Sequence, residues 1–489
     1  MRLLLSLSLF LLVAGVLAGC STASQDTDGD GLSDSREAEV GTDPNKEDTD
    51  EDGLTDAAEV NEDHTNATAP DTDHDGVLDG AEIAAHSNPL VFDPPAFGFG
   101  NLTVVDKTYG PSEPSILVDP AGTVWIAGPT GFVTPATNAD PVPYTHDSGL
   151  WSSKDAGKTW AFNARVPGYG RDACPGGGDS DIAASPDGAL YLIDLWLGNV
   201  PIDVSTDGGN TWLFNCYTSV APGTDRQWVA ATNDYVWISV NHLGLGAEVY
   251  RADKLGLPTD GLVFGPPTLV PDGGVIVVDQ KDGTLYLAGS GETMYVSTDH
   301  GATFKAHQTG LQGTDLSGGF RTIALDAQGN VFVAGSGDAG FVVSGSKDKG
   351  NTWTEAATFA PYAKGDYAFP WMTAGGNGTV DFAWYGRPDP APAGGKGYYV
   401  YAGQSTNVLE LGANATASIV QVTPKPVLTI DICMGLGCGP GRALGDFFEV
   451  GVDLEGHMVI AYDDANGNDP PALMFAKQST GVLAPPQKP

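Results

Sequence analysis

Basic residues and histidines are scarce in this chain of 489 residues. It carries 23 Lys and Arg against 62 Asp and Glu, so its formal net charge is −39. Such a chain offers no basic stripe and repels phosphate backbones, which argues against nucleic acid as a partner. The 8 histidines are scattered, and the sequence contains no Ser-His-Asp, phosphate-loop or zinc signature. Zinc-type catalysis is therefore not expected.

Only one long apolar run is present, from residue 3 to residue 17. It follows the charged start Met1-Arg2 and leads into small residues. A short apolar run with these flanks is typical of a secretory signal and not of a membrane span. The sequence therefore predicts an exported protein.

The signal ends in Leu17-Ala-Gly-Cys20, which resembles a bacterial lipobox. This resemblance implies cleavage before Cys20 and a lipid on its thiol. Ser21 follows, as in lipoproteins sorted to the outer membrane of Gram-negative bacteria. We expect a signal peptide at 1–19, a lipid-anchored linker at 20–25 and a protein held at the cell envelope through the membrane. A plain signal peptide with a chance cysteine is the alternative.

Cysteine is also rare, with 5 residues in all, of which four remain after Cys20. An exported compartment permits disulfides. Three pairings are possible, and we favour Cys174–Cys216 and Cys433–Cys438, the second of which closes a small glycine-rich loop.

Half of the net negative charge lies in one short segment, 26–93, where 22 Asp and Glu stand against Arg36 and Lys46. Three stretches of this segment, starting at Asp26, Asp48 and Asp71, fit D-x-D-x-D-G-x-x-D-x-x-E without gaps. This is the pattern of a Ca²⁺ loop, with carboxylates at positions 1, 3 and 5, a turn glycine at 6, a backbone carbonyl at 7 and Glu at 12. The predicted ligands are Asp26, Asp28, Asp30, Leu32, Asp34, Glu37, Asp48, Asp50, Asp52, Leu54, Asp56, Glu59, Asp71, Asp73, Asp75, Val77, Asp79 and Glu82.

The repeat period of 22 to 23 residues leaves no room for a full helix on each side of a loop. The array therefore resembles thrombospondin type 3 repeats of the bacterial kind, without cysteines in the repeats. That resemblance implies a Ca²⁺-stiffened stalk. A disordered acidic spacer is the alternative.

Long stretches of helical periodicity are scarce in the rest of the chain, whereas glycine is frequent, with 66 residues. Four octapeptides there share the form S-x-D-x-G-x-T-W/F, and they begin at Ser153, Ser205, Ser297 and Ser346. The Asp can accept backbone hydrogen bonds and the Gly can adopt positive φ, so each octapeptide predicts a hairpin corner. The motif resembles the Asp-box, or BNR repeat, of sialidase-like β-propellers.

A second pattern, an apolar strand, a turn of small residues, Asp or Gly, and an apolar or aromatic strand, recurs seven times between residues 116 and 459. Its spacing is typical of four-stranded propeller blades. We therefore predict an all-β fold with a seven-bladed propeller at 94–480, after which 481–489 is a Pro-rich tail. Residues 102–105 are expected to supply the outermost strand of the last blade. Six blades with an irregular insert is the alternative.

Loops of a propeller alternate between two faces, and the face opposite the Asp-boxes is where sialidase-like proteins bind ligand. The chain would place many charged and aromatic residues at this mouth, namely Glu113, Arg171, Asp172, Asp179, Asp181, Asp194, Trp196, Asp225, Arg226, Asn241, His242, Arg321, Asp366, Trp384, Tyr385, Arg387, Arg442, Asp446, Asp463 and Asp464. Such a mouth suits a sugar, an anionic sugar or a peptide terminus. The ligand-binding candidates are Arg226, Arg321, Arg387, Arg442, Trp384 and His242.

Catalysis is the less favoured hypothesis. Sialidases carry an F/Y-R-x-P signature in the first blade, where this chain has Pro111-Ser-Glu113-Pro114 and no arginine. The residues that hydrolysis or elimination would use are Arg321, Asp446, Asp194 and Tyr385. The favoured interpretation is a lipid-anchored, non-catalytic propeller that binds a glycan or a protein outside the cell. An exo-acting sialidase-like hydrolase or lyase is the alternative.

Overall fold

The computed structural model describes residues 25–486 except for 110, 131–147, 164–177, 196–199, 216–222, 243–245, 255–261, 290, 315, 318–320, 433–442 and 469–470. All five cysteines, Cys20, Cys174, Cys216, Cys433 and Cys438, lie outside the described residues, and so do the mouth candidates Arg171, Asp172, Trp196 and Arg442. The lipid anchor and both disulfides therefore stay predictions. The chain divides into two compact units, one of Met1–Asp73 and Val77–Phe92, the other of His74–Gly76 and Asp93–Pro489.

The first unit consists of loops that each lead into a short helix. The helical elements are α1 (Asp34–Val40), α2 (Asp56–Ala58) with the π-turn η1 (Glu59–Asp63), and α3 (Asp79–Ala85). Each helix starts on the Asp at position 9 of a loop motif and ends at a residue with positive φ. The repeat period thus leaves room for one or two helical turns only, as predicted.

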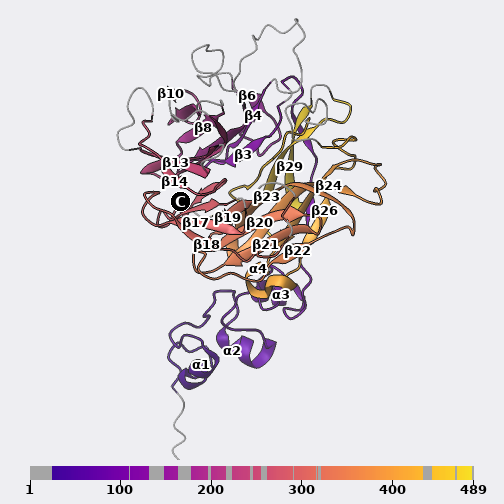
Figure 1. Ribbon diagram of the computed structural model, residues 1–489. Coiled ribbons are helices and arrows are strands. Elements are labelled where there is room, and N and C mark those ends of the chain that lie inside the picture. The colour runs from indigo at the N-terminus through magenta and orange to yellow at the C-terminus, as the bar shows by residue number, and fades with distance from the viewer. Residues whose placement is uncertain are drawn as a thin grey trace, which may run out of the picture. The chain divides into compact units, whose positions relative to one another are not determined.

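The second unit is a ring of seven β-sheets, each of which forms one blade (Figure 1). The innermost strands are β3 (Ser115–Val118), β7 (Ser180–Ala184), β11 (Thr224–Ala231), β15 (Ile276–Val278), β19 (Thr322–Leu325), β23 (Gly365–Gly375) and β27 (Val450–Val452). The second strands are β4 (Val124–Pro129), β8 (Leu190–Asp194), β12 (Tyr235–His242), β16 (Leu285–Ala288), β20 (Val331–Gly337), β24 (Thr379–Pro388) and β28 (Met458–Asp464).

The third strands are β5 (Ser148–Ser153), β9 (Ile202–Ser205), β13 (Gly246–Asp253), β17 (Thr293–Ser297), β21 (Gly340–Ser346), β25 (Tyr399–Ser405) and β29 (Ala472–Thr480). The outer strands of blades one to six are β6 (Ala161–Phe162), β10 (Leu213–Asn215), β14 (Thr268–Val270), β18 (Lys305–Gln308), β22 (Ala357–Phe359) and β26 (Ser418–Gln421). A single-turn helix, α4 (Val408–Leu411), lies between β25 and β26. The predicted count of seven blades is confirmed, and the six-bladed alternative is wrong.

The ring closes through the start of the propeller chain. Strand β2 (Thr103–Asp106) pairs antiparallel with β29 and completes blade seven, as predicted for residues 102–105. Strand β1 (Gly98–Phe99) also pairs with β29, further along the same edge. Pairing of the first strands with the last one leaves no open seam in the sheet of blade seven. Among the described residues, no helix has the length and apolar character needed to cross a membrane.

Each Asp-box forms the corner between the third and fourth strands of blades one, two, four and five. In the copy of blade two, Ser205 Oγ accepts the Gly209 N–H at 2.9 Å, while the Asp207 carboxylate accepts the Thr211 N–H at 2.8 Å and the Thr211 hydroxyl at 2.6 Å. The other three copies repeat these bonds. The four corners share this geometry because the Ser and Asp of the motif accept the backbone N–H groups that have no partner in the sharp turn.

The Asp-box glycine also carries a contact between blades. A Cβ added to Gly209, which has φ 79°, would lie 2.4 Å from the Trp125 ring of blade one. In the same way, a Cβ on Gly157 would lie 2.0 Å from the Phe475 ring of blade seven. Trp160 of that box stacks edge-on against Phe475, with ring centroids 5.2 Å apart. Each of the four Asp-boxes therefore contacts the blade before its own.

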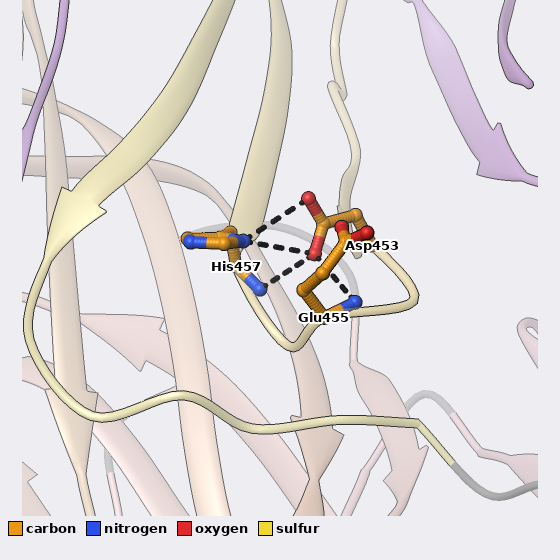
Figure 2. A group of neighbouring side chains, drawn as sticks. All are labelled: Asp453, Glu455 and His457. Carbon is orange, nitrogen blue, oxygen red and sulfur yellow. Dashed lines mark hydrogen bonds and ion pairs between the residues drawn. The ribbon is translucent and has the colours of Figure 1, made fainter. Parts of the chain in front are cut away.

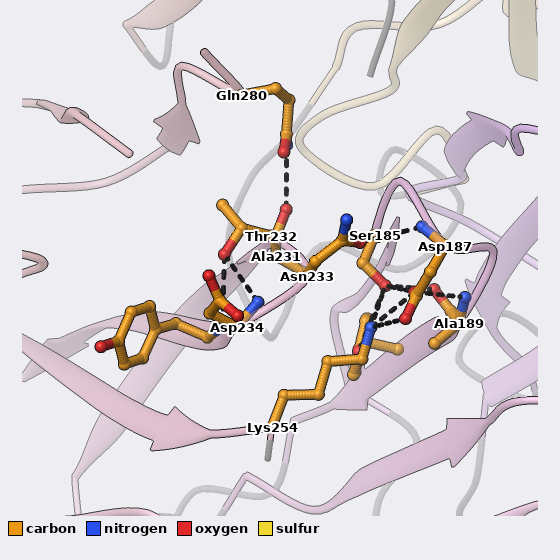
Figure 3. A network of polar contacts seen from close by, with 11 residues as sticks. Ser185, Asp187, Ala189, Ala231, Thr232, Asn233, Asp234, Lys254 and Gln280 are labelled. Atoms are coloured by element: carbon orange, nitrogen blue, oxygen red, sulfur yellow. Dashed lines mark hydrogen bonds and ion pairs between the residues drawn. The ribbon is translucent and has the colours of Figure 1, made fainter. Parts of the chain in front are cut away.

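Blade three has no Asp-box, and a lysine occupies the corresponding corner. Lys254 Nζ donates to Ser185 Oγ at 2.9 Å and to the Asp187 carboxylate at 2.5 and 2.6 Å (Figure 3). Ser185 and Asp187 belong to the inner hairpin turn of blade two, and Asn233 of blade three accepts the Asp187 N–H there. An ion pair between a buried lysine and a half-exposed aspartate thus links blades two and three, where an Asp-box glycine makes the contact in other blades.

The Pro-rich tail packs on the propeller as far as the structure describes it. Ala484 is fully buried, and its N–H donates to the Gly456 carbonyl at 2.8 Å. The Gly376 N–H donates to the Pro485 carbonyl at the same distance. The tail therefore connects the inner hairpin turns of blades six and seven.

Candidate functional site

The calcium-loop motifs bring carboxylates together as the sequence predicts. Ligand oxygens of Asp26, Asp28 and Asp30 lie within 4.8 Å of one another, and the same holds for Asp48, Asp50 and Asp52 and for Asp71, Asp73 and Asp75. The Glu at position 12 is buried in each repeat, with 0% of Glu37, 0% of Glu59 and 2% of Glu82 exposed. Burial and the carboxylates around it raise the pKa of Glu37 to about 7.

Two buried carboxylates of these loops have few or no hydrogen-bond donors in the part of the chain that the structure describes. Neither carboxylate oxygen of Glu37 has a partner, and Glu59 accepts only the Thr65 hydroxyl, through one oxygen. Buried carboxylates without donors favour a bound cation, since desolvated charge otherwise costs several kcal/mol, of the order of 20 kcal/mol for an idealised ion. The hard oxygen ligands are of the kind that Ca²⁺ prefers. The residues present therefore fit Ca²⁺.

The Asp at position 9 has two structural roles that the motif did not reveal. Its oxygens accept the N–H and the hydroxyl of the Thr at position 2, as for Asp56 and Thr49 at 2.8 and 2.7 Å. Asp79 also lies within 4.8 Å of Asp52 and Glu59, which belong to the preceding repeat. The Asp at position 9 therefore closes its own loop through hydrogen bonds, and in the third repeat it also adds a carboxylate to the loop of the preceding repeat. The carbonyl role predicted for Leu32, Leu54 and Val77 stays a prediction.

Four of the mouth residues form one group, which we call the acid–arginine cluster: Glu113, Asp179, Arg226 and Asp446. They come from the loops and strand ends that lead into blades one, two, three and seven. Arg226 donates to both oxygens of Asp446, at 3.1 and 2.5 Å, and the Asp446 N–H donates to Glu113 Oε1 at 3.1 Å. The Glu113 carboxyl is hydrogen-bonded to the carboxyls of Asp179 and Asp446.

The acid–arginine cluster is buried and strained. Only 1% of Glu113 and 3% of Asp446 is exposed. Burial and the two neighbouring carboxylates raise the pKa of Glu113 well above its ordinary value. Glu113 and Arg226 both have positive φ, 54° and 62°, a conformation that costs non-glycine residues roughly 1–3 kcal/mol. A Cβ on Gly445 would lie 2.1 Å from Glu113 Cγ, so only glycine fits beside it. Strain of this kind, held in place by the surrounding contacts, is a mark of functional sites.

Arg387 lies in a different part of the mouth and lines an open cleft of about 650 Å³, which we call the polar cleft. The cleft is lined by Asp338 of blade five, by Ala363, Lys364, Gly365, Asp366, Arg387, Pro388, Asp389, Ala391 and Lys396 of blade six, and by Asp431, which follows blade six. Of these residues, the sequence predicted Asp366 and Arg387. The remaining lining residues were not predicted, because they lie in loops whose sequences do not repeat from blade to blade.

Contacts on three sides fix the guanidinium of Arg387. It forms ion pairs with Asp366, at 2.6 Å, and with Asp431. Its carbon lies 4.7 Å from the ring centroid of Tyr398, and the Tyr398 hydroxyl donates to Asp366 at 2.6 Å. The side chain is 24% exposed. Arg387 thus presents a positioned cation at the cleft surface.

The remaining candidates lie apart from the polar cleft. Trp384 has no exposed surface and packs among the aromatic rings of blades five and six, so in this structure it offers a ligand no contact. Tyr385 is fully buried too, and its hydroxyl accepts the Asp463 N–H at 3.1 Å. Arg321 donates to the Leu316 carbonyl at 2.6 Å.

Asp194 and His242 stand at the ends of the second strands of blades two and three. Asp194 accepts the hydroxyl and the N–H of Ser148, at 2.6 and 3.0 Å. His242 is partly buried, opposite Thr224 in the sheet. The pairing of Asp446 with Asp194 for hydrolysis stays a prediction.

A group of three potential metal ligands lies on the opposite face, in the inner hairpin turn of blade seven (Figure 2). Asp453 accepts the N–H groups of Glu455 and His457 at 3.1 and 2.8 Å. Lys477 forms an ion pair with the same carboxylate. The carboxylate is therefore occupied by the turn and by a lysine, which favours a structural role.

Comparison with known proteins divides the chain in the same way. Residues 26–47, 48–67 and 71–91 match the family described as bacterial TSP3 repeat. Over 181 residues the chain is 27% identical to a xyloglucanase of Hypocrea jecorina, a match that spans 36% of this chain and 19% of the xyloglucanase. The match thus covers about a fifth of that enzyme.

Among solved structures, an α-L-arabinofuranosidase of Fusarium graminearum is 11% identical, with a TM-score of 0.43, 79% of this chain and 97% of that chain being covered. The NanB sialidase of Streptococcus pneumoniae is 12% identical, with a TM-score of 0.40 and coverage of 79% and 71%. Likenesses this low say nothing about activity. The chain thus consists of bacterial TSP3 repeats followed by a seven-bladed Asp-box propeller.

Proposed function

We propose that this protein binds a glycan outside the cell, in the polar cleft of blade six, without cleaving it. One observation carries the proposal: a cleft of about 650 Å³ at the mouth of the propeller, lined by three cations and four carboxylates. This volume is typical of small-ligand sites. Sugar hydroxyls both donate and accept hydrogen bonds, so a lining of mixed sign suits them better than it suits an apolar ligand.

Preorganisation of Arg387 supports binding at this cleft. Its two ion pairs and its stacking on Tyr398 hold the guanidinium before a ligand arrives, which lowers the entropy cost of association. The partial similarity to a xyloglucanase supports a saccharide as the ligand class. A protein ligand is the less favoured alternative, because the polar cleft has no apolar anchor pocket of the kind that dominates protein interfaces.

The hydrolase or lyase alternative rests on the acid–arginine cluster, where Glu113 is a buried acid with a raised pKa. Its geometry favours the non-catalytic role. The two carboxyls of glycosidases stand about 5–5.5 Å or 6.5–9.5 Å apart, whereas Glu113 is in direct hydrogen-bond contact with Asp179 and Asp446. We propose that this cluster holds blades seven, one, two and three in register.

The test of the glycan proposal is a screen of the full-length protein on a glycan array, with Arg387→Ala alongside. Arg251→Ala is the matched control, since Arg251 also stacks on a tyrosine, at 5.2 Å, and also faces a carboxylate, but on the Asp-box face. Binding that is lost in Arg387→Ala and kept in Arg251→Ala supports the proposal. Equal binding by all three proteins would place the site elsewhere.

The second part of the proposal concerns the repeats and the signal peptide, which would hold the propeller at the cell envelope. Ca²⁺ held by the carboxylates of the three loops would stiffen the segment between a lipid on Cys20 and the propeller. Incorporation of labelled fatty acid into the wild type, and none into Cys20→Ser, tests the anchor at the cell envelope. Label retained in Cys20→Ser would refute lipidation at this residue.

A further inference from the structure

A second hollow, of about 640 Å³, adjoins the polar cleft and shares Lys396 with it. We call it the basic hollow. Its walls are residues 393–396, which follow the second strand of blade six, residues 424–426 and 429, which follow the outer strand, and Asn466 of blade seven. These segments lie on the same face as Arg387. A ligand longer than one sugar unit would therefore extend from the polar cleft into the basic hollow.

The basic hollow has the opposite charge to the rest of the molecule. Lys396 and Lys425 are its only ionisable lining residues, in a chain whose net charge is −39. In the described part of the structure, neither lysine has a carboxylate within 4 Å, whereas Lys347 and Lys349 are ion-paired at 2.8 Å and closer. Asp431 lies within electrostatic range of Lys396 but is itself ion-paired with Arg387. Two lysines that are not held in a close ion pair leave a local positive potential, which favours an anionic group.

Close backbone packing builds the hollow. A Cβ on Gly394 would lie 2.7 Å from the Pro424 carbonyl, and one on Gly397 would lie 2.4 Å from the Leu428 carbonyl, so glycine is needed where the two walls meet. The Tyr399 hydroxyl donates to the Gly395 carbonyl at 2.6 Å, and the Tyr398 N–H donates to the Leu428 carbonyl at 2.7 Å. These contacts fix the walls to each other, so the backbone positions of the two lysines are set before a ligand binds, while both side chains are exposed.

We infer that the glycan bound by this protein is acidic, and that a carboxylate or sulfate of the glycan binds between Lys396 and Lys425. The inference rests on the proposed function, because it assigns the neutral part of the ligand to the polar cleft. Thr429 and Asn466 add neutral hydrogen-bonding groups to the lining, which suit the remaining oxygens of the acid group. The whole chain repels anions, so affinity for an acidic glycan must come from these local contacts.

The experiment measures dissociation constants of the full-length protein, loaded with Ca²⁺, for a glucuronate-containing tetrasaccharide and for its carboxyl-reduced form. A sulfated tetrasaccharide of the same backbone separates sulfate from carboxylate recognition. The acidic form is expected to bind more tightly than the reduced one, and the double variant Lys396→Ala/Lys425→Ala to lose about tenfold or more, because charge-assisted hydrogen bonds are the strong ones. The double variant should lose more affinity for the acidic form than for the reduced form, because Lys396 also lines the polar cleft whereas Lys425 lines the basic hollow alone.

The control is Lys281→Ala/Lys305→Ala, which removes the same charge from blade four. A loss of similar size in the control would show that the net charge decides the affinity and would overturn the inference. Equal binding of the acidic, sulfated and reduced forms by the wild type would overturn it too, while leaving the proposed glycan function in place. Failure to bind any of the three would contradict the proposed function as well.

Discussion

Aspartates of this propeller have opposite pKa shifts, according to what surrounds each carboxylate. The Asp-box residues Asp155 and Asp207 lie at the surface, where hydrogen bonds from the Thr of the motif lower their pKa to about 2. Asp381 lies in the core of blade six with 0% exposed, and burial raises its pKa to about 7 despite a bond from Gln404. The same residue type thus stabilises a surface corner and destabilises a core when ionised.

We predict that Asp381→Asn stabilises the propeller at alkaline pH. The raised pKa means that the proton-bound carboxyl stabilises the fold fully below the unfolded pKa of 3.8, and that this contribution is lost as the pH rises through about 7. The loss corresponds to an upper limit of roughly 4 kcal/mol. Asparagine keeps the contact with Gln404 without a charge, so the variant should unfold at higher urea concentration.

Urea unfolding of wild type and Asp381→Asn at about pH 8.5 and about pH 5 makes the comparison. The variant's gain should be largest at the higher pH and should shrink towards the lower one. A difference between the two proteins that does not change with pH would show that Asp381 is ionised in the fold at both pH values.

The Asp-box glycines allow a test of the contact between blades. Gly208 and Gly209 are neighbours with φ of 68° and 79°. A Cβ on Gly208 has nothing within 4 Å, whereas one on Gly209 meets the Trp125 ring at 2.4 Å. Alanine at either position costs about 1 kcal/mol of backbone strain, and overpacking adds about 1–3 kcal/mol at Gly209 only. Chemical denaturation of the two variants should therefore differ, and equal losses would mean that Trp125 moves away freely.

Among the structural elements, the corner strands and the hairpins could be predicted because their signals are local. An Asp-box specifies its own turn through side chains only four residues apart, as Ser205 and Gly209 do. The partner of blade seven could be inferred because an incomplete sheet requires a closing strand, which is β2. The Asp-box turns and the closing strand could both be predicted without knowing how the loops between blades fold.

Trp384 was predicted from the sequence to bind a ligand, but its side chain is buried. Residues of the second strands are buried on both faces, since neighbouring blades cover each side, and such strands have no alternation that identifies an exposed face. An aromatic residue near a strand end therefore gave no sign that it packs inward, against Phe382 and Tyr401. The polar cleft was missed for a related reason, because Lys364, Asp389 and Asp431 stand in loops of irregular length.

The contact that Lys254 makes between blades two and three should contribute to the stability of the propeller. We expect Lys254→Ala to lower the free energy of unfolding by about 1–3 kcal/mol, since it removes a nearly buried charge that joins blades two and three. Without Lys254, water would solvate the half-exposed Asp187, and this limits the loss of stability. Lys305→Ala, at an exposed position of the outer strand of blade four, should change the free energy of unfolding by less than about 0.5 kcal/mol. Equal effects of the two variants would remove the case for a link between blades.

At the scale of the whole molecule, the repeat segment should depend on calcium. Its 22 acidic and 2 basic residues leave buried carboxylates such as Glu37 without donors. With EDTA we expect residues 26–93 to become sensitive to protease, while the propeller fragment resists. Added Ca²⁺ should restore protection, and Glu37→Gln/Glu59→Gln should require more Ca²⁺ for it. Equal cleavage with and without Ca²⁺ would refute the stiffened segment.

The two functional regions differed in how far the sequence could predict them. A calcium loop takes its ligands from twelve consecutive residues, so each loop could be inferred from the spacing. Only the approach of Asp79 to Asp52 and Glu59 needed the structure. The mouth of the propeller collects residues that are distant in sequence, and their grouping depends on which loops lie next to one another in the ring.

Calorimetric titration of an array-selected glycan into the full-length protein tests the central claim most directly. For glycan binding without cleavage we expect saturable heats of a single site, with no heat after saturation. We expect a loss of affinity of about tenfold or more in Arg387→Ala and none in Arg251→Ala. A steady heat that continues after each injection, and that is abolished in Glu113→Gln, would show turnover at the acid–arginine cluster and contradict a non-catalytic propeller.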